Sequence, residues 1–385
     1  MSNLSKWEPF RFHQERELMH RLEELLHMDL LEPVLKQATV QEERDYWYSL
    51  HEGQSFRLTP ELAPHHYHLC QEVLDILEFE SPIEFYIASN PTFNAASYLS
   101  TKENTPHLVV FHSGLVENFN DMEFRFVVGH EVGHIPFKAS KFRKFLSQLF
   151  PEEQDLPLSI NNLLRLWDKF AEISADRIGF LASPDLKSCV TAFFKLSSGL
   201  SMERIKVDFS QYLNEVREMI ENYSPHKGLF YSSHPANPIR IKAVESFQNS
   251  KLYQNYSQKG IFIEDQEFEK EMEKLAQLME LHPDNQRDYF RLLLIASGGL
   301  VIADLDGEIA IEEEDRIIYF LSQFTVYPRK FLEEIKETAK TPKERENLFL
   351  DSVDKLLQMD PGERYAIFTF LTQMALSEKK KKKEE

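Results

Sequence analysis

Cysteine is almost absent from this sequence. Cys70 and Cys189 are the two cysteines among 385 residues, and they are neither clustered nor spaced like metal ligands. This scarcity argues against a disulfide framework and against a cysteine-based zinc site, and it favours a reducing compartment. We therefore expect a cytoplasmic protein.

Long apolar runs and an excess of positive charge are lacking as well. The longest apolar stretch, Leu292–Ala303, is too short to span a bilayer. The N-terminal residues contain no apolar core of the kind that a signal peptide needs. The net charge of −19 argues against a main role on nucleic acid or on an anionic membrane. We expect no membrane span and no nucleic-acid partner.

The composition instead indicates folded domains of mixed character. Apolar residues make up 42% of the chain, which excludes wholesale disorder, and the length allows two or three domains. Acidic residues exceed basic ones by 9 in residues 1–262 and by 10 in the much shorter remainder. This shift predicts a domain boundary near residue 262. We expect a helical segment at 1–59 that packs on a domain at 60–262, an all-α domain at 263–378, and a solvated charged tail at 379–385.

The predicted fold class is α+β, mostly helical, with a small sheet in the 60–262 domain. Residues 83–89 and 107–116 are short, rich in β-branched or aromatic residues, and bounded by turn formers, so both predict strands. Residues 61–79 predict an amphipathic helix. Another helix should start at Asn120 or Asp121, with Glu123 in its first turn. In the acidic region we expect helices at about 268–279, 286–303, 311–324, 328–339, 343–358 and 361–377.

The sequence His130-Glu131-Val132-Gly133-His134 has the form H-E-x-x-H. Residues four apart share one face of a helix, so both imidazoles can reach one metal ion. Glu131 would then project beside the open coordination position, where it can take a proton from a water molecule. The alternative is an ordinary pair of histidines on a buried helix.

Two glycines in the same helix argue against that alternative. Gly129 and Gly133 each cost about 1 kcal/mol relative to alanine in a helix interior. Glycine at such positions lets another backbone or a ligand approach closely. Pro136, two residues after His134, should end or kink the helix because its ring clashes with the carbonyl of Val132.

A catalytic zinc needs a third protein ligand, and a second helix offers one. Glu172 and Asp176 are four residues apart, which places both carboxylates on one helical face. Glu172 would complete a His₂Glu ligand set, and Asp176 would accept a hydrogen bond from a ligating histidine. If Glu172 is not the ligand, His112 and His107 are the next candidates.

A third segment contains His234-Pro235 in a loop and Arg240-Ile241 at the start of a helix. An imidazole or guanidinium that reaches the site from outside would stabilise the oxyanion of a tetrahedral intermediate. Alone, this segment would be an ordinary His-Pro turn before a helix.

Together these three segments resemble the HtpX-like and CAAX-prenyl-protease zinc metallopeptidases, over roughly residues 60–250. The resemblance implies a zincin-like endopeptidase of the gluzincin type with one zinc ion per chain. It implies that His130, His134 and Glu172 bind the zinc and that Glu131 is the general base. His234 would help to hold the oxyanion, with Asp176 and Arg240 as supporting groups.

The resemblance extends to a substrate strand. The segment Phe93–Tyr98 is similar to the Asn-Ala segment that precedes the active-site helix in that family. It implies that Asn94 and Ala95, with Val109 and Val110 in the strand at 108–112, offer a sheet edge to a protein or peptide substrate. The membrane spans common in the family are missing, so membrane-embedded substrates are not implied.

The acidic C-terminal region has a separate resemblance, to the TerB-like helical domains of tellurite-resistance proteins. An EF-hand is excluded because Ile302 would stand where the first carboxylate belongs. Either a tight turn at Asp306-Gly307 with acids capping the next helix, or weak divalent binding, fits the segment. We expect the zinc endopeptidase to use this region to bind a partner protein. A catalytically silent zinc-containing scaffold and a stress-response adaptor are the alternative functions.

Overall fold

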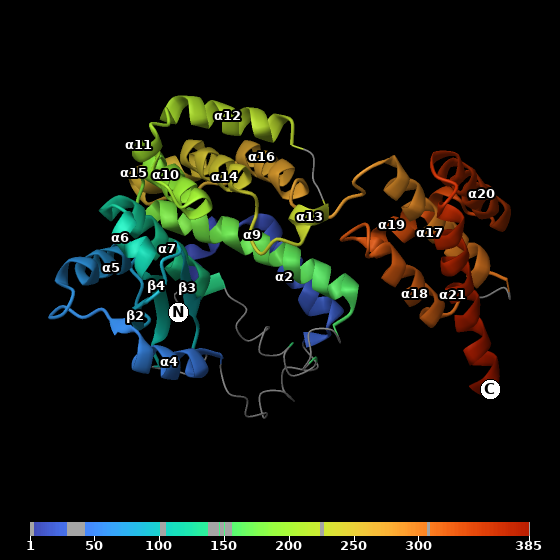
Figure 1. Cartoon of the computed structure of the whole chain (residues 1–385), viewed down its shortest axis with the longest axis horizontal. Coiled ribbons are helices and arrows are strands. Elements are labelled where there is room, and N and C mark those ends of the chain that lie inside the picture. Colours follow the sequence, from blue (N-terminus) through green and yellow to red (C-terminus); the bar gives the residue numbers. More distant parts are fainter. Residues whose placement is uncertain are drawn as a thin grey trace. The chain divides into compact units, whose positions relative to one another are not determined.

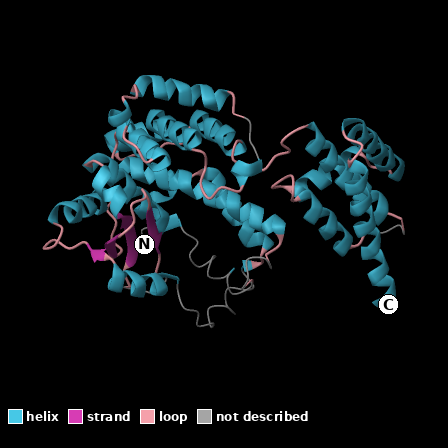
Figure 2. Cartoon of the chain, viewed as in Figure 1, coloured by secondary structure: helices cyan, strands magenta, loops and turns pink. Residues whose placement is uncertain are grey.

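The computed structural model describes residues 4–28, 43–100, 105–137, 146, 150, 156–223, 227–305 and 309–384. It is mostly helical with one four-stranded sheet, so the predicted α+β class is confirmed (Figure 2). Two compact units are present. The larger comprises residues 1–153, 167–223 and 233–278, and the smaller comprises residues 154–166, 224–232 and 279–385. None of the helices in the described part of the chain has the length and apolarity to cross a membrane.

The sheet of the larger unit has the strand order β1-β2-β4-β3 (Figure 1). Strand β4 pairs parallel with β2 and antiparallel with β3, while β1 pairs antiparallel with β2. The bounds are β1 (Phe56–Arg57), β2 (Ile83–Ala88), β3 (Ala95–Tyr98) and β4 (His107–His112). The two predicted strands are thus confirmed at 83–88 and 107–112.

Both faces of this sheet are covered by helices. On one face, Trp47 and Tyr48 of α4 (Glu43–Gln54) pack against Tyr86, Leu108 and Val110. On the other face, the Phe111 ring lies 4.9 Å from the ring of Phe124 in α7 (Asp121–Phe137). Helix α5 (Pro64–Ile76) packs beside α7. Alternate residues of β4 therefore serve two separate apolar layers.

The prediction of a strand over residues 113–116 is wrong, because α6 (Ser113–Asn118) begins directly after β4. The Gly114 N–H donates to the Asn90 carbonyl at 3.0 Å, and Ser113 Oγ donates to the same carbonyl. A Cβ on Gly114 would lie 2.1 Å from the carbonyl oxygen of Pro91. The chain can turn here because glycine leaves room for that backbone.

The rest of the larger unit is helical. The N-terminal segment packs on α9 (Leu158–Ala182) through Phe12, whose N–H donates to Ser174 Oγ at 2.9 Å. Residues 158–166 of α9 and all of α13 (Lys227–Phe230) are grouped with the smaller unit. The remaining elements of the larger unit are α1 (Leu4–Trp7), η1 (Glu8–Phe10), α2 (His13–Leu25), α10 (Leu186–Ser198), α11 (Met202–Ile205), α12 (Phe209–Glu221), α14 (Asn237–Asn249), α15 (Lys251–Lys259) and α16 (Gln266–Gln277).

Helix α16 groups with the larger unit, so the units divide after Leu278. Phe268 of α16 is 4% exposed, and its ring lies under the guanidinium of Arg177 at 4.8 Å. The apolar face of α16 is therefore buried against helices that precede it in the chain. The domain boundary predicted near residue 262 stays a prediction.

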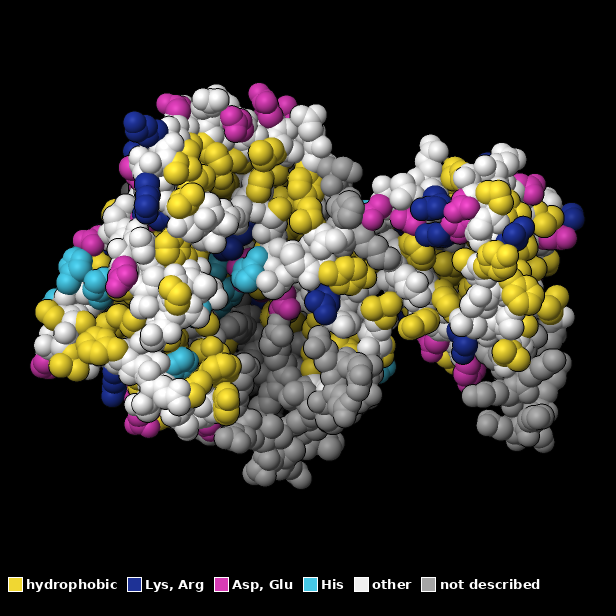
Figure 3. Space-filling view, viewed as in Figure 1, with side chains coloured by type: hydrophobic (Ala, Val, Ile, Leu, Met, Phe, Trp, Pro, Cys, Tyr) yellow, Lys and Arg dark blue, Asp and Glu magenta, His cyan; other side chains and the backbone are white. Residues whose placement is uncertain are grey.

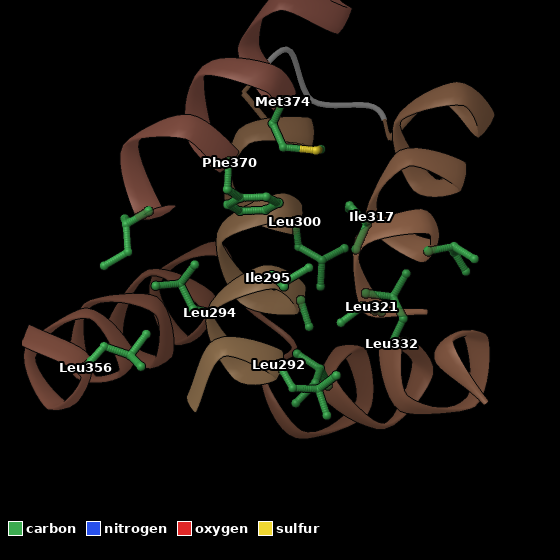
Figure 4. Packing of buried hydrophobic residues seen from close by; sticks show 14 residues of the cluster. Leu292, Leu294, Ile295, Leu300, Ile317, Leu321, Leu332, Leu356, Phe370 and Met374 are labelled. Carbon is green, nitrogen blue, oxygen red and sulfur yellow. The ribbon is translucent and has the colours of Figure 1, made fainter. Parts of the chain in front are cut away.

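The smaller unit contains α17 (Gln286–Ala303), α18 (Ile311–Leu321), α19 (Pro328–Thr338), α20 (Pro342–Met359) and α21 (Glu363–Glu384). Leu292, Ile295 and Leu300 of α17 lie at its centre, packed by Ile317, Leu356 and Phe370 of the surrounding helices (Figure 4). Cβ atoms on Gly298 and Gly299 would lie within 2.7 Å of Phe349 and Ile317. These glycines let α18 and α20 pack closely on α17.

Two expectations for this unit can be compared with the structure. Glu313 accepts a hydrogen bond from the Ala310 N–H at 2.8 Å, so an acid does cap α18 as predicted. The Asp306-Gly307 turn lies outside the described residues. The charged run expected to be a frayed tail continues α21 as helix to Glu384.

Candidate metal centre

The candidate site rests on a close contact between α7 and α9. A Cβ on Gly129 would lie 2.5 Å from the Cβ of Ala182, and one on Gly133 would lie 2.9 Å from the Cβ of Ile178. The two helices can approach this closely because α7 has glycines at these two positions, which leave room for the α9 side chains and backbone. The clearance predicted for these glycines is confirmed, and the neighbour is α9.

Helix α7 begins as its sequence predicts. Asn120 Oδ1 accepts hydrogen bonds from the N–H groups of Met122 and Glu123 at 3.0 Å, and Glu123 accepts one from the Asn120 N–H at 2.8 Å. This reciprocal capping fixes the register of the helix that carries the motif. Pro136 lies within the last turn described, and α7 is described as far as Phe137.

Three side chains converge between α7 and α9. His130 Nε2 lies 3.2 Å from His134 Nε2 and 3.5 Å from Glu172 Oε2, and His134 Nε2 lies 3.3 Å from Glu172 Oε1. His130 and Glu172 are each 8% exposed. Among the described residues, these three form the group of histidine, cysteine and carboxylate side chains that could hold one metal ion.

The spacing of these atoms fits zinc. Zinc–ligand bonds of about 2.0–2.1 Å in a tetrahedron separate the ligand atoms by about 3.3 Å. The separation of the two imidazole nitrogens, 3.2 Å, lies close to that value, as do the distances of 3.5 and 3.3 Å from these nitrogens to Oε2 and Oε1 of Glu172. Glu172 Oε2 is also buried and accepts no hydrogen bond in the described part of the chain, and Arg240 Nη2 is 3.3 Å away as an ion-pair partner. A carboxylate oxygen that accepts no hydrogen bond beside two imidazoles is a donor set that a divalent cation would complete.

Asp176 lies directly behind His130. The Nδ1 of His130 is 2.9 Å from Asp176 Oδ1, and the Asp176 side chain is fully buried. Arg240, in the first turn of α14, donates from Nε and Nη2 to the two carboxylate oxygens of Asp176 at 2.8 and 2.6 Å. This arrangement fixes the ring of His130 and leaves its Nε2 facing Glu172. The guanidinium of Arg240 thus holds Asp176, and its Nη2 also lies 3.3 Å from Glu172 Oε2, so it supports the site from within.

The electrostatics of the site follow from these contacts. Burial alone would lower the pKa of His130, but the carboxylates of Asp176 and Glu172 against its two ring nitrogens raise that pKa to about 10. Burial would raise the pKa of Glu172, but the charges of His134 and Arg240 hold it well below its usual range. Burial would likewise raise the pKa of Asp176, but the charge of Arg240 lowers it. Glu172 and Asp176 are therefore ionised at neutral pH, and a metal ion at His130 Nε2 would compete with a proton.

His234 lies at the outer rim of the same site. Its Nε2 is 3.7 Å from Glu172 Oε2, and its Nδ1 is 2.8 Å from Ser233 Oγ. The side chain is 55% exposed, and histidine side chains are visible on the face of the larger unit shown in Figure 3. The structure thus brings together all the residues that the sequence predicted as ligands, supporting groups and oxyanion donor.

The predicted substrate strand needs a correction. Val109 and Val110 lie in β4, which is paired on both sides, with Phe85 and Tyr86 in β2 and with Ser97 and Ala96 in β3. Its backbone groups are used within the sheet, so β4 offers no edge to a substrate. Ala95 lies in the edge strand β3, and the Asn94 carbonyl accepts a hydrogen bond from His112 N at 3.0 Å.

The alternative third ligands are engaged elsewhere. His107 Nδ1 accepts a hydrogen bond from Ser100 N at 3.1 Å, and His112 Nδ1 contacts Thr92 Oγ1 at 2.8 Å. Sequence reasoning missed the α9 residues that face α7, namely Ala175, Gly179 and Ala182. Their small size at helical spacing was a signal that could have predicted the close contact.

Comparisons with known proteins agree with this geometry. Residues 68–153 match the model of peptidase family M48, and this range contains His130, Glu131 and His134. A curated relative, the plastoglobule-localized metallopeptidase 48 of the Arabidopsis thaliana chloroplast, is 24% identical over 201 residues. That alignment covers 49% of this chain and 58% of the relative, so the chain spans little more than half the relative's length.

Both matches are thus likenesses to metallopeptidases, and the likeness to peptidase family M48 covers the segment that contains the H-E-x-x-H motif. The family match ends at residue 153, before Glu172, Asp176, His234 and Arg240. Those four residues are connected to the motif by the spatial contacts described above.

Proposed function

We propose that the protein is a zinc-dependent metalloendopeptidase. The observation that carries the proposal is the convergence of His130 Nε2, His134 Nε2 and the Glu172 carboxylate, whose Oε2 lies 3.5 Å from His130 and whose Oε1 lies 3.3 Å from His134. The match to peptidase family M48 supports the same reaction class. One zinc ion per chain would be held by these three residues, which leaves a fourth position open.

The chain's own residues would do the remaining chemistry. Bound zinc would supply a Lewis acid that polarises the scissile carbonyl and makes an attacking water more acidic. Glu131, 6% exposed and adjacent to His130, would take the proton of that water and pass it to the leaving amine. Asp176 would keep His130 in the tautomer that presents Nε2, and Arg240 would keep Asp176 ionised.

His234 would stabilise the oxyanion. Its ring is near the ligand set but outside it, and it is solvent-exposed, so a substrate carbonyl can approach it. Removal of one oxyanion donor usually costs about 10²–10³ in kcat. As a ligand it would occupy the fourth position, which a catalytic zinc keeps open for water or substrate.

The substrate would bind as an extended chain along β3. This strand lies at the edge of the sheet and packs against α7, the helix that carries the motif. Ala95 and the neighbouring Asn94 are therefore the residues we propose for backbone recognition. An edge beside the ligand helix would place a scissile bond near Glu131.

Two further proposals concern the smaller unit and the cellular compartment. The smaller unit would be a TerB-like domain that binds a partner protein through its acidic helices. The cytoplasm remains the proposed compartment, and Cys70 and Cys189, both buried free thiols, are consistent with it.

The test is hydrolysis of a broad peptide library by the full chain loaded with one zinc, compared with Glu131→Gln. We expect cleavage inside the peptides by the wild type and a loss of at least about 10²-fold in Glu131→Gln with the metal retained. A zinc-loaded wild type that cleaves nothing would favour the scaffold or adaptor alternative.

A further inference from the structure

The helix that supplies Glu172 and Asp176 also has a buried rear face. At 3.6 residues per turn, Ser174 lies about 200° around α9 from Glu172, on the side that Phe170 and Arg177 share. Ser174 is fully buried and Arg177 is 1% exposed. The residues that cover this face come from the N-terminal stretch Phe10–Glu15.

Ser174 is the centre of the contact. Its Oγ accepts a hydrogen bond from the Phe12 N–H at 2.9 Å and donates one to the carboxylate of Glu15. Glu15 is fully buried, and its carboxylate also lies 3.2 Å from the Arg11 guanidinium. One hydroxyl therefore satisfies both a buried backbone donor and a buried carboxylate on the N-terminal stretch.

Arg177 makes a second connection one turn along α9. Its Nη1 donates to the Phe10 carbonyl at 3.1 Å. Its guanidinium lies over the rings of Phe12 and Phe268, at 5.4 and 4.8 Å from their centroids. The N-terminal stretch is thus fixed to α9 by hydrogen bonds on one side and by aromatic contacts on the other.

The opposite face of α9 must be held within a fraction of an ångström, because a metal site tolerates displacements of about 0.5 Å. Glu172 and Asp176 are joined to α7 and α14 by polar contacts at the front. Loss of the rear contacts would leave the Phe12 N–H and the Glu15 carboxylate buried without Ser174. Movement that relieves this cost would rotate or shift the helix and displace Glu172 with it.

We propose that Phe10–Glu15 is a positioning element for the metal-ligand helix, acting through Ser174, so that metal affinity depends on this stretch being seated on α9. The proposal rests on the proposed function in one respect, that Glu172 is a metal ligand. Ser174 and Glu15 are positioning residues, since neither contacts the ligand set.

The experiment uses the full chain with Ser174→Ala or Glu15→Ala. Zinc affinity is measured by competition with a chromophoric chelator, and ligand geometry is followed by the visible absorption of the cobalt-substituted protein. We expect the dissociation constant for zinc to rise about tenfold, at the lower end of what loss of a supporting group costs. The cobalt spectrum should change in the same variants. Glu15→Gln keeps an acceptor for the Ser174 hydroxyl and should restore most of the affinity lost in Glu15→Ala.

A matched control is Ser250→Ala. Ser250 is 3% exposed and its Oγ accepts a hydrogen bond from Tyr253 N at the start of α15, so its removal also weakens a buried contact in the larger unit. Zinc affinity and the cobalt spectrum should not change in this variant, even where its thermal stability falls as much as that of Ser174→Ala. Equal zinc affinity in Ser174→Ala and Ser250→Ala would overturn the inference alone. Failure of the wild type to bind zinc would overturn the proposed function and this inference with it.

Discussion

Gly129 and Ala182 are in such close contact that a Cβ on the glycine would lie 2.5 Å from the alanine Cβ. Neither residue is a proposed ligand, yet this contact sets the distance between the two helices that carry the ligand set. Glu172 can lie 3.3 Å from His134 because α9 packs directly on the backbone of α7.

Gly129→Ala should therefore separate the helices. The added methyl group meets a second helix and the backbone of Gly179 at 3.0 Å, so it cannot be absorbed by a rotamer change. We expect a loss of about 1–3 kcal/mol in the free energy of unfolding, as for overpacked cores, together with weaker zinc binding. Urea denaturation and metal titration of the same preparations provide the measurement.

Gly53→Ala is the matched control. Gly53 is also in a helix, α4, but a Cβ there would have nothing within 4 Å. Alanine should leave zinc affinity unchanged and stabilise the protein by up to about 1 kcal/mol, through helix propensity. Similar destabilisation by both substitutions would contradict the steric explanation.

Glu172→Ala should remove the third ligand. We expect zinc affinity to fall by more than about 100-fold, beyond what outer groups of a metal site contribute. Metal content after dialysis is the measurement. His107→Ala and His112→Ala, the alternatives by sequence, should retain a full equivalent of zinc, and loss of metal in either would move the third ligand there.

Asp176→Asn tests the support of His130. The substitution keeps the shape of the side chain but removes the carboxylate charge that Arg240, 6% exposed, contacts most closely, which leaves Glu172 Oε2 at 3.3 Å as its remaining carboxylate. Breaking a buried pair in this way costs about 3–5 kcal/mol. Thermal unfolding should show the lower stability, and zinc titration should show a zinc affinity reduced about 10–100-fold. An unchanged affinity would show that Asp176 does not orient the ligand.

Glu280→Gln should change the pH dependence of stability. Burial raises the pKa of Glu280 from its ordinary value of 4.5 to about 7. Because the folded state holds this proton more tightly than the unfolded chain, stability falls as pH rises from about 4.5 to about 7 and then levels off. Glutamine removes that loss, so the variant should gain about 1–3 kcal/mol over the wild type at pH 8 but not at pH 4.

Thermal denaturation of both proteins across this pH range is the measurement. Glu267→Gln serves as the control, because the side chain of Glu267 is 90% exposed. The difference in stability between Glu267→Gln and the wild type should not depend on pH. A Glu280→Gln curve parallel to that of the wild type would show that the pKa of Glu280 is the same in the folded and unfolded states, and would contradict the prediction.

Most of the candidate site could be predicted from the sequence because its signals are local. The four-residue spacing of His130 and His134, and of Glu172 and Asp176, places each pair on one helical face whatever the rest of the chain does. The Asn120 cap and the strands at β2 and β4 are local in the same way. A catalytic zinc needs a third protein ligand beside two histidines, and this need indicated that the helical faces of His130 and Glu172 lie together.

Relations between elements could not be predicted, because they depend on packing. Only the tertiary structure decided that β4 is an interior strand, that Arg240 holds Asp176, and that α16 groups with the larger unit. Only the tertiary structure likewise showed that Ser174, on the face of α9 opposite Glu172, contacts the N-terminal stretch. The sequence by itself determined which side chains are offered on each helix. The close contact of Gly129 with Ala182 decided that they meet, because the distance between two helices is set by the size of the residues between them.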